Sequence, residues 1–175
     1  MPNWEIDVEA KDDLVVEGYA AVTNSPTVLC TDIHGYEYRE IISPTAFDGA
    51  DTSDVIFIYN HDQDALPVAR TRNDTLKINF DEKGMHIRAQ LADTTAGRDL
   101  YQLVKRGDID KMSFAFTVAD DHYEEDGTGE TRHIDKIDKI VDVSAVPFPA
   151  YDETTLEARS KDRMMRKMLI LKTYF

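Results

Sequence analysis

The feature that most constrains the fold is an alternation of bulky and small side chains between residues 112 and 118. Bulky apolar side chains stand at every second position, at Met112, Phe114, Phe116 and Val118. Small side chains stand between them, at Ser113, Ala115 and Thr117. Because successive side chains of a strand point to opposite faces, the pattern predicts a strand with one core face and one uncrowded face. A serine on the uncrowded face is either a reactive group lining a cleft or an inert small residue beneath a loop.

An amphipathic helix precedes this strand. Residues 95–106 carry apolar side chains at helical spacing, Thr94 or Thr95 can cap the start, and Gly107 is suited to the end. Strands are predicted at 4–8, 14–22, 36–42, 55–59, 67–71, 75–80, 85–92 and 134–146. Residues 23–35 are predicted as a loop, 43–47 as the start of a short helix capped by Ser43, and 120–130 as an acidic hairpin tip. The pattern indicates a mostly β protein with helices, of the α+β class.

Charge divides the chain into two parts. We expect one domain over residues 1–151 and a basic, Met-rich helical extension over 152–175. Residues 159–175 carry a charge of +5, so the rest of the −14 chain carries −19. An acidic body argues against nucleic-acid binding, and no apolar run approaches the roughly 20 residues of a membrane span. A single cysteine, Cys30, excludes an internal disulfide and favours a reducing compartment.

Three side chains of the catalytic-triad type stand beside predicted strands. His61 follows a continuous apolar strand, Asp142 lies within another, and Ser113 begins the alternating one. Such a set can perform nucleophilic catalysis, in which the histidine takes the serine proton and the acid orients the histidine. Each residue also has an ordinary structural interpretation: a hydrogen-bonded rim histidine, a buried acid paired with a base, and a small core serine. The spacing in the chain leaves both interpretations open.

The other histidines have weaker contexts. His34 lies in a loop, His86 on a strand, and His122 and His133 flank the acidic hairpin. A metal hydrolase built on His61, Asp62 and Asp64 is a rival hypothesis, but the chain lacks a second histidine at zinc-motif spacing. We therefore expect no metal and no cofactor.

Four segments, in order, resemble the prohead (capsid maturation) proteases of tailed bacteriophages. Residues 39–47 resemble the family's E-x-I-x-P-G-A-F segment, and residues 55–62 resemble its apolar strand ending in Asn-His-Asp. Residues 103–116 resemble its helix-G-x-(I/L)-x-G-x-S-F-G-F element, and residues 142–151 resemble E-V-S-x-V-x-F-P-A-Y. Thr45, Lys111 and Ala115 stand where the family usually has glycine, and Asp142 stands where it usually has glutamate.

The resemblance implies a serine endopeptidase with His61 as base, Ser113 as nucleophile and Asp142 as third member, with Asp138 as the fallback acid. By loose analogy with herpesvirus assemblin, backbone N–H groups around Ala150 and Tyr151 would form the oxyanion hole. The implied fold is a barrel-like antiparallel sheet similar to assemblin.

The resemblance also implies partners and a place of action. The substrates would be scaffold segments of capsid protein and the protease itself, and the enzyme would form a homodimer or higher oligomer. It would act in the host cytoplasm, inside the assembling prohead. The alternative is a catalytically inert assembly module of the same fold that binds scaffold or capsid protein.

Overall fold

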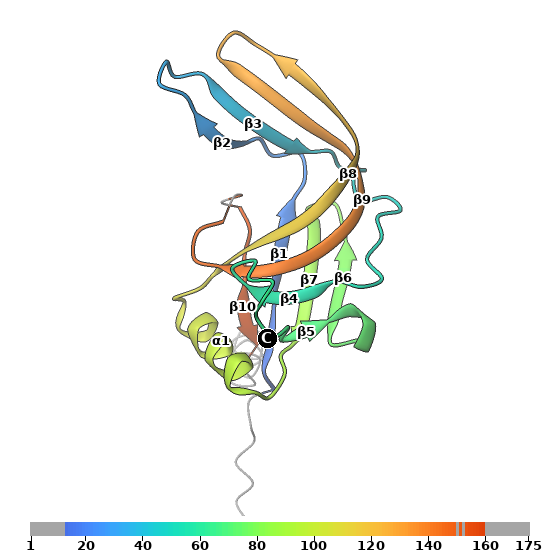
Figure 1. Ribbon diagram of the computed structural model, residues 1–175, viewed down its shortest axis with the longest axis vertical. Coiled ribbons are helices and arrows are strands. Elements are labelled where there is room, and N and C mark those ends of the chain that lie inside the picture. The colour runs from blue at the N-terminus through green and yellow to red at the C-terminus, as the bar shows by residue number, and fades with distance from the viewer. Residues whose placement is uncertain (1–12, 150, 152, 160–175) are drawn as a thin grey trace, which may run out of the picture.

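The computed structural model describes residues 13–149, 151 and 153–159, which form strands and one α-helix (Figure 1). In chain order the elements are β1 (Val15–Val22), β2 (Thr27–Thr31), β3 (Glu37–Ile42), β4 (Ile56–Tyr59), β5 (Ala69–Arg70), the 3-10 turn η1 (Thr71–Asn73), β6 (Leu76–Phe80), β7 (Gly84–Gln90), α1 (Thr95–Arg106), β8 (Lys111–Glu125), β9 (Gly129–Val146) and β10 (Glu157–Arg159). The predicted α+β class is therefore confirmed. The strand expected at 4–8 lies outside the described residues.

The strands form two sheets, and no closed barrel is found among the described residues. One sheet has the order β10-β1-β7-β6, and the other has the order β2-β3-β9-β4-β5 with β8 paired to β9. The second sheet is mixed, because β9 pairs parallel to both β3 and β4. The expected barrel-like antiparallel sheet is therefore not confirmed, because the pairs of β9 with β3 and β4 are parallel. Parallel pairs need long connections, and the chain between β4 and β9 supplies one that contains β6 and β7, two of the four strands of the other sheet.

A single apolar core connects the two sheets and the helix. Its members include Val16 of β1, Ile87 of β7, Phe57 of β4 and Val143 of β9, all fully buried. Met112 and Phe114 of β8 are also buried, which confirms the predicted core face of that strand. The apolar face of β8 therefore packs against the core of the protein.

The long β8–β9 hairpin arches across the molecule, with β3 beside its outer half (Figure 1). Its strands extend well beyond the predicted 111–118 and 134–146, and the acidic tip narrows to residues 126–128. Asp126 Oδ1 organises this turn by accepting hydrogen bonds from the backbone N–H groups of Thr128 and Gly129. The register shifts several times along the pair, first between Ala115 and Phe116.

Helix α1 begins and ends where the sequence predicts. The Thr94 hydroxyl accepts from the Gly97 N–H at 3.2 Å, and Gly107 adopts φ 85° while its N–H bonds the carbonyls of Leu103 and Val104. Both ends are thus satisfied by the caps that helices commonly use. None of the described helices has the length and apolar character needed to cross a membrane.

Two local predictions are wrong. Residues 44–49 form successive turns in place of a helix, because the Ser43 hydroxyl bonds Asp135 of β9 at 3.1 Å and does not cap the segment. Residues 27–31, expected in a loop, form β2 by pairing with β3. The partner of Ser43 is distant in the sequence, whereas β2 pairs with the next strand of the chain, β3, as a hairpin.

The predicted C-terminal helix is also wrong at its start. Glu157–Arg159 forms strand β10, antiparallel to β1 in the register Val16↔Ala158. Leu156 and Ala158 bury their side chains in the core. An open edge of β1 offers unpaired N–H and C=O groups, and pairing with it satisfies the backbone of the arriving segment. Residues 160–175, where the rest of the helix was expected, lie outside the described part.

Candidate active site

His61 is presented just beyond the end of β4 by an unusual backbone. Asn60 and His61 both adopt positive φ, 53° and 55°. The Asn60 N–H donates to the carbonyl of Ala145 at 3.0 Å, so the chain is still attached to β9 as it turns. Two consecutive left-handed residues other than glycine cost on the order of 1–3 kcal/mol each, so surrounding contacts must hold them. The imidazole is about one third exposed, at 36%.

Asp142 is the partner of that histidine. Its carboxylate is fully buried, and its Oδ1 lies 2.7 Å from His61 Nδ1. Its other oxygen, Oδ2, accepts from the side-chain amide of Gln63 at 3.0 Å. The hydrogen bond requires a proton on His61 Nδ1, because a carboxylate can only accept. A buried carboxylate inside an apolar strand needs a partner, and the partner of Asp142 is His61.

A register shift lies beside Asp142 in the β8–β9 ladder. Ala115 faces Asp142, but the next residue, Phe116, faces Ile140, which leaves Val141 as the extra residue of a bulge. Bulges re-aim side chains and occur often next to functional sites. Here the bulge is the first of several register shifts, and it lies directly beside the buried carboxylate.

Ser144 is a member of the site that the sequence analysis missed. Its hydroxyl donates to Asp142 Oδ1 at 2.9 Å and accepts from the backbone N–H of His61 at 3.0 Å. It also lies 3.3 Å from His61 Nδ1, and it is fully buried. One hydroxyl thus stabilises both the left-handed backbone of His61 and the carboxylate that holds its ring. The alternation of β9 gave a usable signal, since Ser144 lies two residues from Asp142 and shares its face.

Ser113 faces Ser144 directly across the β8–β9 ladder. Directly opposed side chains share one face of a sheet, with Cβ atoms roughly 4.5–5.5 Å apart. Ser113 is mostly buried, with 8% of its surface exposed. Within the described part of the chain no hydrogen bond joins Ser113 to His61, and catalytic hydrogen bonds are often long before substrate binds. The three predicted side chains are thus brought to one corner of the mixed sheet.

The structure gives less support to Asp138 as the catalytic acid and to the hypothesis of a metal hydrolase. Asp138 is exposed, and its carboxylate accepts from Thr117 at 3.3 Å. Asp62 accepts from the backbone N–H of Asp64, and His61 Nδ1 is already engaged by Asp142. Among the described residues, the group whose ligand atoms lie close enough to hold a metal contains none of these.

The oxyanion candidates are only partly described. Ala150 lies outside the described residues. Tyr151 is buried, and its hydroxyl donates to the buried carboxylate of Glu40, which Arg132 Nη1 approaches at 3.3 Å. Burial, followed by the bond to Glu40, raises the pKa of the Tyr151 phenol, so it remains a neutral donor. The contact fixes the segment after β9 against β3.

Comparison with known proteins identifies related chains. The family model described as caudovirus prohead serine protease matches residues 4–168. A protein named prohead protease, from Enterobacteria phage HK97, is 34% identical over 148 residues, which is 82% of this chain and 59% of that protein. The chain thus spans about three fifths of the length of this relative. No solved structure gives a significant match.

Proposed function

Because the chain belongs to the caudovirus prohead serine protease family, we propose that it is a serine endopeptidase that cleaves scaffold segments of phage capsid protein during prohead maturation. The single observation that carries the proposal is the 2.7 Å hydrogen bond between buried Asp142 and His61, next to the strand pair that holds Ser113. A buried carboxylate bound to a partly exposed imidazole favours the tautomer with a free Nε2.

In the proposed acylation step, the Ser113 hydroxyl attacks the carbonyl carbon of the scissile peptide bond. His61 Nε2 takes the hydroxyl proton as the C–O bond forms, and Asp142 stabilises the resulting imidazolium. His61 then gives that proton to the leaving amine as the C–N bond breaks. The products of this step are an acyl ester on Ser113 and the C-terminal peptide with a free amine.

Deacylation repeats the sequence with water. His61 takes a proton from a water molecule, which attacks the ester carbonyl, and returns a proton to Ser113 Oγ as the ester breaks. The free carboxyl of the N-terminal peptide leaves, and the side chains return to their starting state. This cycle uses only side chains, backbone donors and water, with N–H groups near Ala150 and Tyr151 as the proposed oxyanion donors.

The decisive experiment is co-expression of the chain with the capsid protein of the same phage, with products identified by mass spectrometry. We expect wild-type protein to trim the capsid protein and itself, and Ser113→Ala to abolish both cleavages. Ser53→Ala, at an exposed loop position, is the matched control and should cleave normally. Cleavage that continues in Ser113→Ala would refute the protease proposal and favour the inert assembly module.

The same proposal places the enzyme inside the assembling prohead in the host cytoplasm, with scaffold segments and its own chain as substrates. We further propose a homodimer or higher oligomer, a fold related to assemblin, and a helical, basic extension over residues 160–175. Confinement with concentrated subunits would favour even a weakly associating enzyme. Sedimentation of the Ser113→Ala protein over a range of concentrations tests the oligomer without self-cleavage.

A further inference from the structure

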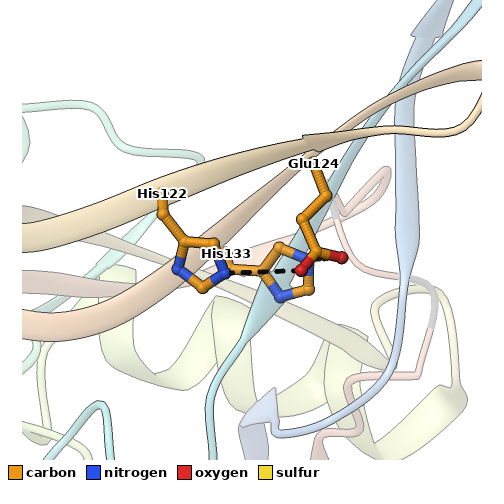
Figure 2. Close-up of side chains that lie close together, drawn as sticks. All are labelled: His122, Glu124 and His133. Carbon is orange, nitrogen blue, oxygen red and sulfur yellow. Dashed lines mark ion pairs between the residues drawn. The ribbon is translucent and has the colours of Figure 1, made fainter.

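Two histidines and a glutamate meet on one face of the β8–β9 hairpin, away from the candidate active site (Figure 2). His122 and Glu124 lie two residues apart on β8, and His133 faces His122 directly across the ladder. The alternation of each strand therefore places all three side chains on the same face. The cluster lies farther out along β8 than Ser113, by roughly 30 Å of extended chain.

The ligand atoms are close to the spacing that a tetrahedral metal ion needs. Glu124 Oε1 lies 3.8 Å from His122 Nε2, and Glu124 Oε2 lies 3.4 Å from His133 Nε2. One ligand atom from each of the three residues lies within 4.8 Å of the other two. Two ligands bound to Zn²⁺ at 2.0–2.2 Å lie about 3.4 Å from each other at the tetrahedral angle. The two imidazoles are stacked, with ring centroids 4.6 Å apart and ring planes 8° apart. Because the lone pair of a ring nitrogen lies in the ring plane, the two rings must tilt toward each other for both Nε2 atoms to bind one ion.

A carboxylate outside the cluster orients one of its imidazoles. His122 Nδ1 lies 2.5 Å from Asp135 Oδ2, and the other oxygen of Asp135 accepts from the Ser43 hydroxyl at 3.1 Å. Histidines that bind metal through Nε2 commonly donate their Nδ1–H to such a carboxylate, which fixes the tautomer and ring orientation. Asp135 is itself held by Ser43 of the segment after β3, so the arrangement spans three segments of the chain.

We propose that His122, Glu124 and His133 form a binding site for one divalent ion of the Zn²⁺ type, with Asp135 as the outer carboxylate. Two imidazoles and one carboxylate suit Zn²⁺ and its late transition-metal neighbours better than Mg²⁺ or Ca²⁺, which prefer oxygen ligands. The exposed side of the cluster leaves a fourth position for water. The bound ion would join the two arms of the hairpin at the directly opposed pair His122 and His133, in the regular stretch of the ladder beyond the register shifts, and we assign it no part in peptide cleavage.

The test is isothermal titration of ZnCl₂ into the full chain, produced without a histidine tag and first freed of metal by a chelator. We expect one equivalent to bind, more than tenfold weaker binding in His133→Ala and Glu124→Ala, and about 10–100-fold weaker binding in Asp135→Asn. MgCl₂ should give no comparable heat. Zn²⁺ should also raise the thermal midpoint of the wild type but not of His133→Ala, because an ion that binds only the folded state stabilises it.

Two control variants exclude other ligands. His34→Ala removes an exposed loop histidine, and Cys30→Ser removes the exposed thiol of β2, and both should bind Zn²⁺ as the wild type does. Glu124, whose side chain is 69% exposed, can be replaced without disturbing the core, so its variant remains informative if His133→Ala unfolds. The proposal is overturned if the wild type binds no Zn²⁺, or if Glu124→Ala and His133→Ala bind it with unchanged affinity.

Discussion

At the scale of single residues, the site depends on how His61 is held. Its left-handed backbone is stabilised through one N–H bond to Ser144, and its ring through one bond to Asp142. Ser144 in turn bonds Asp142, so the three residues form a closed set of hydrogen bonds. Removing one member leaves buried groups of the others unpaired, which costs about 1–3 kcal/mol per group.

Asp142→Asn is expected to retain the fold and lose activity. The amide keeps the size of the carboxylate, but it no longer stabilises the imidazolium and can favour the wrong tautomer of His61. In serine proteases this kind of change lowers kcat by about 10⁴-fold. Cleavage of a capsid-derived peptide, followed at several pH values, measures it. Asp138→Asn is the matched control, and a larger loss there would reassign the acid.

Ser144→Ala is expected to slow catalysis by about 10–100-fold through kcat, with KM little changed. The variant loses the acceptor for the His61 N–H and the donor to Asp142, so the imidazole is less well positioned. Thr154 offers a comparison, since its buried hydroxyl accepts from the Met112 N–H on β8 and donates to the Tyr151 carbonyl, and among the described residues it forms no hydrogen bond with His61 or Asp142. Thr154→Val should lower stability without shifting the pH profile of kcat. If Ser144→Ala behaves in the same way, Ser144 has only a structural role.

At the scale of elements, the backbone around Thr155 lies close against the backbone of β1 in the first sheet. Thr155 exchanges hydrogen bonds with Tyr19 of β1, through Thr155 N–H to the Tyr19 carbonyl at 2.9 Å and Tyr19 N–H to Thr155 Oγ1 at 3.1 Å. A Cβ on Gly18 would lie 1.9 Å from the Thr155 carbonyl oxygen. Glycine at position 18 therefore allows β10 to complete the sheet.

Gly18→Ala is expected to lower the free energy of unfolding by about 3 kcal/mol, because backbone atoms and not a flexible side chain must move. Gly35→Ala is the control: its added methyl group meets open space, although its φ of 84° costs about 1 kcal/mol. Urea denaturation of the two variants measures the difference. If both variants lost the same free energy of unfolding, the segment after residue 153 would separate readily from β1.

At the scale of the whole molecule, stability is linked to a strongly acidic composition with a net charge of −14. Hydrogen bonds from neighbouring groups lower the pKa of several aspartates below the usual 3.8, including Asp51, Asp54, Asp74, Asp81 and Asp126. For Asp126 the main cause is the Arg39 guanidinium, followed by Thr128. These carboxylates must stay ionised to keep their partners.

We expect the urea midpoint to fall as the pH drops below 3.8. A group whose folded-state pKa lies below its unfolded value contributes stability that is fully present above the unfolded pKa, and this stability is lost as pH falls toward the folded value. The Asp126→Asn variant should therefore lose less stability than the wild type between about pH 4 and pH 2. Asp48→Asn, at an exposed turn, is the comparison. If the urea midpoint of Asp126→Asn fell with pH in parallel with that of the wild type, Asp126 would not contribute to the acid sensitivity of the fold.

Features that depend on residues close together in the chain could be predicted from the amino-acid sequence. The period of residues 112–118 and the caps of α1 were correct because side-chain alternation and terminal hydrogen bonds are local. The candidates His61, Ser113 and Asp142 were visible because each is polar beside an apolar strand, and their catalytic roles stay a prediction. The cost of burying an unpaired charge predicted only that Asp142 has a partner, and the family resemblance implied that this partner is His61.

Which strands lie side by side could not be predicted from the sequence and is known from the structure. The parallel pairing of β9 with β3 and β4 unites segments far apart in the chain, and it brings Ser144 under the backbone of His61. Likewise, β10 forms because β1 offers an open edge, and the Ser43 hydroxyl bonds Asp135 where a helix cap was expected. Strand edges and registers are satisfied by long-range hydrogen bonds, and local sequence patterns do not specify the partner.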